Sequence, residues 1–304
     1  MKSSRRFDPR SLDEVKKSPQ SALLLLNERA RRGADLAALA RRLLAEHGIR
    51  SVEPSAGQSF QDAIREHGEA VCCVIVGGGD GTLNGCVEAV AALGKPLGIL
   101  PLGTANDFAR SMRIPPKLSA AVDCIINGKA VPVDIGLANG LPYLNVASVG
   151  FSAELSASLT ASSKKRWGKI GYAINAARLL AKSRLFSATI QHDGRTERFR
   201  TFQVSVGNGR FYGGGMTVHQ SASPTDGMLD VYSLELSHWW KMLALLPALR
   251  RGTHGARREV RSFSSKALTL HARRRLPVNL DGELRTYTPV HFLIREKALL
   301  VYAP

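Results

Sequence analysis

The sequence predicts two folds in succession: an α/β fold with a parallel sheet in the N-terminal part, and an antiparallel β domain in the C-terminal part. Short apolar runs alternate with helical patterns over residues 22–128, which is typical of a parallel sheet. From residue 131 onward, paired strand patterns around Asn-Gly and Asp-Gly turns replace them. The chain has 304 residues, of which 44% are hydrophobic, so it can form two cores.

The first elements of the N-terminal part are short strands and amphipathic helices. Segment 35–47 is the clearest helix, because its apolar residues recur at three- and four-residue spacing. Gly48 is a suitable C-cap for it. Strands are predicted at 22–26, 49–52 and 71–76, and a second helix at 60–67.

A glycine-rich loop follows the strand at 71–76 and reads GGGDGT over residues 77–82. A helical pattern begins near Leu83 and stops near Gly94. A strand, a glycine loop and a helix together present bare backbone N–H groups to a phosphate. Asp80 is a candidate to hold a metal-bound water, and Thr82 offers a hydroxyl. The alternative is a tight turn without a ligand, and the missing lysine argues against a P-loop NTPase.

A second strand-and-turn segment comes next in the chain. Residues 97–100 are strand-like, and Pro-Leu-Gly-Thr-Ala-Asn-Asp at 101–107 leads into a short helix. The carboxyl ends of adjacent parallel strands meet at one edge of a sheet, where open α/β sheets bind ligands. We therefore expect both turns to lie together.

The two turns carry a family resemblance. GGGDGTLN at 77–84 and LPLGTANDFA at 100–109 resemble the nucleotide-binding signatures of the diacylglycerol kinase catalytic domain, specifically of bacterial lipid kinases. NAD kinases share GGDGT, but the GTxNDFA partner belongs to lipid and sphingoid kinases. The resemblance runs from about Leu23 to the C-terminus and implies ATP and Mg²⁺ as cofactors. The nucleotide contacts it implies are Asn27, Gly78, Gly79, Asp80, Gly81, Thr82, Asn84, Thr104, Asn106 and Asp107.

The loop after the first strand departs from the family pattern. Lipid kinases commonly carry an Asn-Pro-x-Ser-Gly type of turn there, whereas this chain has NERARRG at 27–33 and keeps only Asn27. The arginines Arg29, Arg31 and Arg32 either contact phosphates instead or are solvated. Gly85 stands where the family has a glutamate. These departures leave the donor preference and the strength of catalysis open.

The C-terminal part is predicted to be mostly strands. Hairpins are expected at 131–137 with 143–149, and at 188–191 with 197–206. Further strands are expected at 229–236, 267–272, 277–280 and 290–295, and helices at 164–185 and 239–249. The resemblance implies a β-sandwich whose last strands return to the first domain. The predicted organisation is a basic tail at 1–20, an α/β nucleotide-binding domain at 21–132 with about 289–304, and a β-sandwich domain at 133–288.

Two short motifs carry the remaining candidate chemistry. In ASPTDGMLDV at 222–231, the resemblance implies a structural Mg²⁺ held by the Asp226 carboxylate and the carbonyl groups of Ser223 and Met228. The alternative is an ordinary turn that enters a strand. In LDGEL at 280–284, the resemblance implies that Glu283 accepts a proton from the lipid hydroxyl across the interdomain cleft, with Asp281 in support. Without the resemblance, Asp281 and Glu283 are two ordinary surface carboxylates on a hairpin turn.

Charge and composition narrow the partners and the compartment. The net charge of +17 favours polyanionic partners such as ATP, nucleic acid or an anionic membrane. No nucleic-acid motif is visible, so we expect no specific nucleic acid. The sequence has neither a run of about 18 apolar residues nor a signal peptide, and its four cysteines lack metal-ligand spacing. We expect a cytoplasmic protein that is peripheral on the inner face of the membrane, and a homodimer is compatible with the sequence.

A pair of tryptophans is relevant to whether the protein contacts a membrane. Trp239 and Trp240 start an apolar helix that arginines follow, and Arg273, Arg274 and Arg275 form another basic cluster. The tryptophan helix is either a membrane contact or an ordinary core helix.

The function expected from these features is ATP-dependent phosphorylation of a lipid hydroxyl, that of diacylglycerol or a related lipid, in a cleft between two domains. One alternative is an NAD-kinase-like enzyme that acts on a small molecule, since it shares the GGDGT loop. The other is a non-catalytic protein that binds nucleotides or polyanions through its charge.

Overall fold

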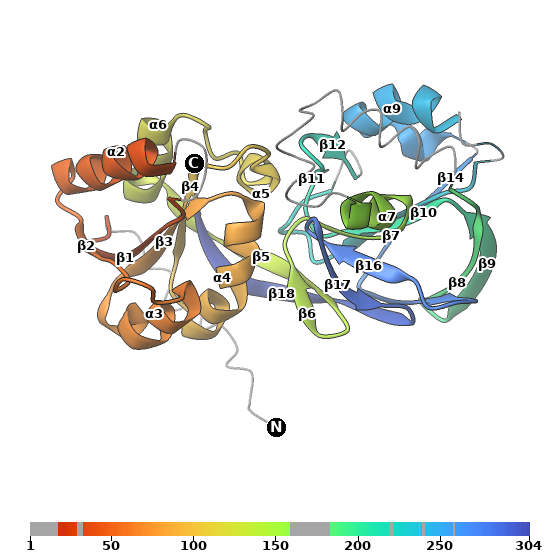
Figure 1. The fold of residues 1–304 in the computed structure, drawn as a ribbon, viewed down its shortest axis with the longest axis horizontal. Helices are drawn as coiled ribbons and strands as arrows, with labels where there is room; N and C mark the ends of the chain where they lie inside the picture. Colours follow the sequence, from red (N-terminus) through yellow and green to blue (C-terminus); the bar gives the residue numbers. More distant parts are fainter. Residues whose placement is uncertain are drawn as a thin grey trace. The chain divides into compact units, whose positions relative to one another are not determined.

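The computed structural model describes residues 18–28, 33–158, 183–218, 222–236, 238, 241–257 and 259–304. The chain divides into two compact units, Met1–Ile135 with Glu296–Pro304, and Gly136–Arg295. We call them the N-terminal unit and the C-terminal unit and describe each by itself (Figure 1). The predicted tail, the arginines at 29, 31 and 32, most of the predicted helix at 164–185 and the tryptophans at 239 and 240 lie outside the described residues.

The N-terminal unit is built on a parallel sheet in the order β2-β1-β3-β4, which the end of β18 extends. Every pairing among these strands is parallel. Helices α2 and α6 lie on one face, and α3 and α4 on the other (Figure 1). The interior strand β1 is buried along its whole length, which explains its unbroken apolar sequence. The elements are β1 (Ser21–Leu26), α2 (Gly33–Glu46), β2 (Arg50–Val52), α3 (Phe60–His67), β3 (Cys73–Gly78), α4 (Asp80–Leu93), β4 (Leu97–Pro101), α5 (Asp107–Ser111) and α6 (Leu118–Asn127).

The glycine loop is shorter than the sequence pattern indicated. Strand β3 continues to Gly78, and α4 begins at Asp80 instead of near Leu83. Gly79 is the N-cap, and its carbonyl accepts hydrogen bonds from Thr82 N at 3.0 Å and Leu83 N at 3.1 Å. Asp80, Gly81 and Thr82 therefore form the first turn of α4, because the hydrogen bonds to the Gly79 carbonyl already begin the helix there.

The C-terminal unit contains two antiparallel sheets. One has the order β14-β13-β10-β7-β16-β17, and the other joins the start of β18 to β15, β8 and β9. One core contains Val149, Val204 and Val278 of the first sheet and Ile190 and Phe292 of the second, so the sheets pack face to face as a sandwich. The predicted fold class is confirmed. The elements are β5 (Lys129–Ala138, shared between the units), β6 (Leu141–Tyr143), β7 (Val146–Gly150), α7 (Phe151–Ser158), β8 (Phe186–His192), β9 (Arg195–Thr201), β10 (Gln203–Gly207), β11 (Phe211–Tyr212), β12 (Met216–Thr217), β13 (Leu229–Leu234), α9 (Lys241–Arg251), β14 (Val260–Ser265), β15 (Ala267–Ala272), β16 (Pro277–Leu280), β17 (Glu283–Tyr287) and β18 (Val290–Ala303).

The second arms of both predicted hairpins are wrong in the same way. Segment 143–149 was expected to be one strand, yet β6 ends at Tyr143 and β7 starts at Val146 in the other sheet. Segment 197–206 likewise splits into β9 and β10, which lie in different sheets. Tertiary hydrogen bonds interrupt both strands. Between β9 and β10, Phe202 N donates to Leu234 O at 2.9 Å. Between β6 and β7, the N–H groups of residues 144 and 145 donate to a carboxylate that is described below.

Candidate active site

The two predicted nucleotide turns lie against each other in the N-terminal unit. Strands β3 and β4 are neighbours, with Gly78 opposite Pro101. Gly78 O accepts hydrogen bonds from Leu102 N at 3.0 Å and Gly103 N at 3.2 Å. A Cβ atom added to Gly103 would lie 2.4 Å from the Cα of Gly79, so the two backbones touch at a point where no side chain fits.

Asn27 ties the end of β1 to this pair of loops. Its backbone N donates to Gly77 O at 2.9 Å, and its side-chain Nδ2 donates to Thr82 Oγ1 at 2.9 Å. Three neighbouring strands, β1, β3 and β4, thus bring their carboxyl ends to one site. The predicted residues Asn27, Gly79 and Thr82 are brought together as the sequence suggested.

The Asp80 carboxylate connects the two loops. Its Oδ2 accepts a hydrogen bond from Asp107 N at 3.1 Å, and its Oδ1 accepts one from Phe108 N at 3.0 Å. These are the first two N–H groups of α5, so Asp80 acts as the side-chain cap for this helix. A carboxylate has about four acceptor positions, so one carboxylate can accept bonds from backbone N–H groups and from a metal-bound water together.

The remaining predicted residues of the second loop shape it from within. Asn106 has φ 51°, its Oδ1 accepts from Gly103 N at 3.0 Å, and its Nδ2 donates to Gly103 O at 2.9 Å. Thr104 is exposed at the tip. Asp107 is buried, with Oδ1 at 3.9 Å from Arg110 Nη1. Asn106 thus holds the loop's shape through its amide group. The sequence analysis had named it only as a nucleotide contact.

The start of α4 is suited to an anion. The first N–H groups of a helix have no partner within the helix, and the helix dipole adds positive potential there. Gly81 is exposed in this first turn, and Asn84 lies further along the same helix. Asn84 Oδ1 is buried and accepts no hydrogen bond from the described residues. Together, the helix start and the bare glycines form a cradle that fits a nucleotide phosphate.

In the C-terminal unit, Asp281 binds three consecutive backbone N–H groups. Its Oδ2 accepts from Leu144 N at 2.7 Å, and its Oδ1 accepts from Asn145 N at 2.9 Å and Val146 N at 3.0 Å. Asp281 therefore fixes the crossing of the chain from β6 to β7. Burial raises the pKa of the neighbouring Tyr143 hydroxyl, and the Asp281 charge raises it further, so Tyr143 stays neutral.

Three buried amides, those of Asn145, Asn208 and Asn279, surround this crossing, and the sequence analysis selected none of them. Asn208 Nδ2 donates to Leu144 O at 2.9 Å, and Asn208 N donates to Asn145 O at 2.9 Å. Asn279 Oδ1 accepts from Gly282 N at 2.9 Å. An asparagine inside a predicted strand, as at Asn145 and Asn279, was the available signal for two of these amides.

Glu283, two residues after Asp281, has a different environment. It is the first residue of β17, and its side chain is 60% exposed. Its Oε2 accepts a hydrogen bond from Arg285 Nη1 at 3.2 Å. Within this unit the carboxylate is therefore accessible to solvent and to a substrate.

The predicted magnesium loop is a tight turn between Ala222 and β13. Asp226 Oδ1 accepts from Met228 N at 3.0 Å, and Ser223 Oγ lies 2.9 Å from Thr225 Oγ1. One carboxylate with backbone carbonyl groups of Ser223 and Met228 is an all-oxygen donor set, which fits a hard cation such as Mg²⁺. No group of three or more His, Cys, Asp or Glu side chains suited to a metal occurs among the described residues.

Over the described part of the chain, every helix is too short or too polar to cross a bilayer.

The parallel-sheet unit with paired glycine loops, followed by a β-sandwich unit, is the architecture of a class of two-domain kinases. Two family models match the chain: the diacylglycerol kinase catalytic domain over residues 21–138, and the YegS C-terminal NAD kinase beta sandwich-like domain over residues 145–303. The chain therefore belongs to the diacylglycerol kinase family. This family assignment supports kinase activity.

Individual relatives agree with this assignment. A diacylglycerol kinase from Staphylococcus aureus (strain bovine RF122 / ET3-1) is 29% identical over 252 residues, which cover 82% of this chain and 79% of that protein. A crystal structure from Bacillus anthracis strain Sterne, assigned as a diacylglycerol kinase, superposes with a TM-score of 0.82 at 24% identity, covering 95% of this chain and 97% of the other. A second crystal structure, of a diacylglycerol kinase from the same strain, has a TM-score of 0.73 at 21% identity over 95% and 98%. At these identities the structures show the common fold.

Proposed function

We propose that this protein is an ATP-dependent lipid kinase that phosphorylates the hydroxyl group of diacylglycerol or a related lipid. The observation that carries the proposal is the contact between Gly79 and Gly103, which joins two signature loops at the carboxyl edge of a parallel sheet. The family models and the names of the relatives support the kinase class. The lipid acceptor rests on the GTANDFA motif at 103–109 together with those names.

The chain's own residues have separate roles in this proposal. The first-turn N–H groups of α4 bind phosphate oxygens, and Thr82 and Asn27 contribute a hydroxyl and an amide beside them. Glu283 accepts the proton of the lipid hydroxyl as the hydroxyl oxygen forms a bond to the γ-phosphorus of ATP, while the bond from that phosphorus to the bridging oxygen breaks and ADP leaves. Mg²⁺, when bound, neutralises charge on the phosphates. Asp80 would hold it through water, and the 223–228 loop would hold a second, structural ion.

A lipid acceptor lies in a bilayer, so the proposal includes peripheral association with the inner face of the membrane. The net charge of +17 supports it, since anionic leaflets attract basic proteins.

The test is transfer of labelled phosphate from ATP with Mg²⁺ to acceptors in mixed micelles. The panel contains diacylglycerol, phosphatidylglycerol, a sphingoid base and, as a soluble acceptor, NAD. Transfer to one lipid and none to NAD is the expected result and identifies the substrate. Transfer to NAD alone would replace the proposal with the small-molecule kinase. A protein that neither binds ATP nor gains thermal stability from it contradicts the nucleotide site itself.

A further inference from the structure

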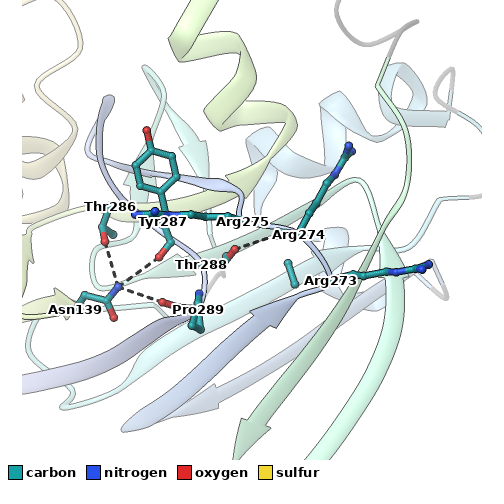
Figure 2. A pocket seen from close by; sticks show the side chains of 9 residues that line it. Asn139, Arg273, Arg274, Arg275, Thr286, Tyr287, Thr288 and Pro289 are labelled. Carbon is teal, nitrogen blue, oxygen red and sulfur yellow. Dashed lines mark hydrogen bonds between the residues drawn. The ribbon is translucent and has the colours of Figure 1, made fainter.

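Outside the candidate active site, the C-terminal unit has an open hollow of about 500 Å³ formed by three loops (Figure 2). The turn after β5 supplies Asn139, and the ends of β15 and β17 with the loops that follow them supply the other residues. The remaining lining residues are Ala272, Arg273, Arg274, Arg275, Thr286, Tyr287, Thr288 and Pro289. The lining holds three guanidinium groups and no carboxylate, so the hollow is electropositive.

The loops are fixed to one another by hydrogen bonds from two residues. Thr288 is buried; its N donates to Leu276 O at 2.9 Å, and its Oγ1 accepts from Leu276 N at 2.9 Å. Asn139 Nδ2 donates to Thr286 Oγ1 at 3.1 Å and to Pro289 O at 3.2 Å. The polar groups of Thr288 and Asn139 thus build a rigid platform, which leaves the arginines to meet solvent or a partner.

The arginine side chains extend outward from this platform. All three are exposed, and none makes an ion pair within the described part of the chain. Figure 2 shows Arg273 and Arg274 pointing away from each other, while Arg275 lies along the ring of Tyr287. The Arg275 guanidinium carbon is 4.5 Å from the ring centroid. Arginines that fan out suit many phosphates spread over a surface better than one small anion enclosed by several donors.

Strand β17, whose end lines the hollow, has two exposed apolar side chains. Tyr287 is 48% exposed and Leu284 is 40% exposed. The pairing of β16 with β17 shifts by one residue between Val278 and Asn279, so Leu284 lies opposite Asn279 and Tyr287 lies opposite Pro277. Since Asn279 and Pro277 are two residues apart on β16, the bulge puts Leu284 and Tyr287 on the same face of the sheet.

We propose that Arg273, Arg274, Arg275, Tyr287 and Leu284 form a docking surface for an anionic phospholipid bilayer. Arginines bind lipid phosphates in the headgroup layer, while a tyrosine and a leucine enter its apolar boundary. Nucleic acid would need the charges but not the exposed leucine. The choice of a lipid partner rests on the proposed function, because an enzyme that acts on membrane lipid must reach the bilayer.

The test measures binding of the full chain to vesicles of phosphatidylcholine alone and of phosphatidylcholine with phosphatidylglycerol. The triple variant Arg273→Gln/Arg274→Gln/Arg275→Gln should bind the anionic vesicles about 100-fold more weakly, at about fivefold for each arginine. The matched control is Arg195→Gln/Arg198→Gln/Arg200→Gln, which removes three exposed arginines from β9 of the same unit. Its binding to the anionic vesicles should weaken less than tenfold, because these three arginines lie outside the proposed docking surface. Tyr287→Ala should weaken binding about fivefold to tenfold through lost apolar burial.

Four results would overturn the docking surface. One is an equal loss in both triple variants, which would make binding a property of net charge. The second is unchanged binding by the Arg273–275 triple variant. The third is release of the protein from anionic vesicles by millimolar inorganic phosphate at constant ionic strength, which would indicate a small-anion site. The last is a larger loss of binding to a single-stranded RNA oligomer than to vesicles.

Phosphate transfer to diacylglycerol in uncharged detergent micelles separates this inference from the proposed function. The triple variant should keep wild-type turnover there, because the surface acts only on the bilayer. If the wild-type protein also shows no turnover in micelles, the proposed lipid kinase activity is contradicted, while the vesicle-binding result still stands.

Discussion

The glycine loops of the N-terminal unit and the 280–284 turn of the C-terminal unit use aspartate in the same way but differ in what stands beside it. Asp80 binds two N–H groups at the start of α5, and Asp281 binds three at the start of β7. Around Asp80, neighbouring groups are backbone and glycine, which suit a phosphate. Beside Asp281, Glu283 projects into solvent and pairs with Arg285. Aspartate in both motifs thus supports the architecture, which is why the proposed mechanism assigns proton transfer to Glu283 and not to Asp281.

The largest expected effect tests that division at Glu283. Glu283→Gln removes the base and should lower kcat for lipid phosphorylation by about 10²- to 10⁴-fold. Its stability should stay within about 0.5 kcal/mol of wild type, because the side chain is exposed and its ion pair is weak. Steady-state kinetics and urea denaturation measure the two quantities. Arg285→Gln is the control, since it breaks the same ion pair and should retain most of the activity. Unchanged kcat in Glu283→Gln would remove the proposed base.

Asp281 should show the opposite pattern, with the loss in stability. Asp281→Ala leaves three N–H groups without their acceptor and places alanine at φ 49°, so we expect a loss of about 3–5 kcal/mol in unfolding free energy. Asp281→Asn tolerates that φ and keeps one acceptor oxygen, and it should lose about half as much. Urea denaturation of both variants measures this. A stable Asp281→Ala protein that has lost only activity would make Asp281 a direct participant in catalysis.

The glycine contact of the N-terminal unit should be less costly to break but specific for nucleotide. Gly103→Ala puts a Cβ atom 2.4 Å from the backbone of Gly79, and no flexible side chain can move aside there. We expect a loss of about 1–3 kcal/mol in stability and weaker ATP binding. Gly85→Ala on α4 is the matched control. Its Cβ atom meets nothing within 4 Å, so alanine should stabilise the helix by about 0.5–1 kcal/mol. Equal ATP affinity in Gly103→Ala and wild type would separate the loop contact from nucleotide binding.

The two units also differ in how far sequence predicts them. In the N-terminal unit, β3, its glycine loop, α4 and β4 follow one another directly in the chain. Because β3 and β4 are also neighbours in the sheet, the pattern at 71–109 contains most of the site. In the C-terminal unit, Asp281 binds Leu144, and Asn139 binds Thr286, across 137 and 147 residues. Such contacts leave no periodic signal, and they decide where β6 ends. Strand β17 was missed because it is exposed over four of its five residues and so lacks an apolar alternation. Strand β14 and helix α7 were missed as well.

The smallest expected effect concerns the side-chain bond that joins β1 to the glycine loop. Thr82→Val keeps the shape of the side chain but removes the hydroxyl that accepts from Asn27 Nδ2 at 2.9 Å. Since a single hydrogen bond contributes about 0.5–1.5 kcal/mol, we expect a stability loss of that size. If Thr82 also contacts phosphate, the rise in melting temperature caused by ATP and Mg²⁺ should shrink further in this variant than its own stability loss explains. Thr82→Ser, which keeps the hydroxyl, should retain that rise. A full rise in Thr82→Val would make the hydroxyl, like the two aspartates, a support for the loop, and would leave phosphate binding to the backbone N–H groups alone.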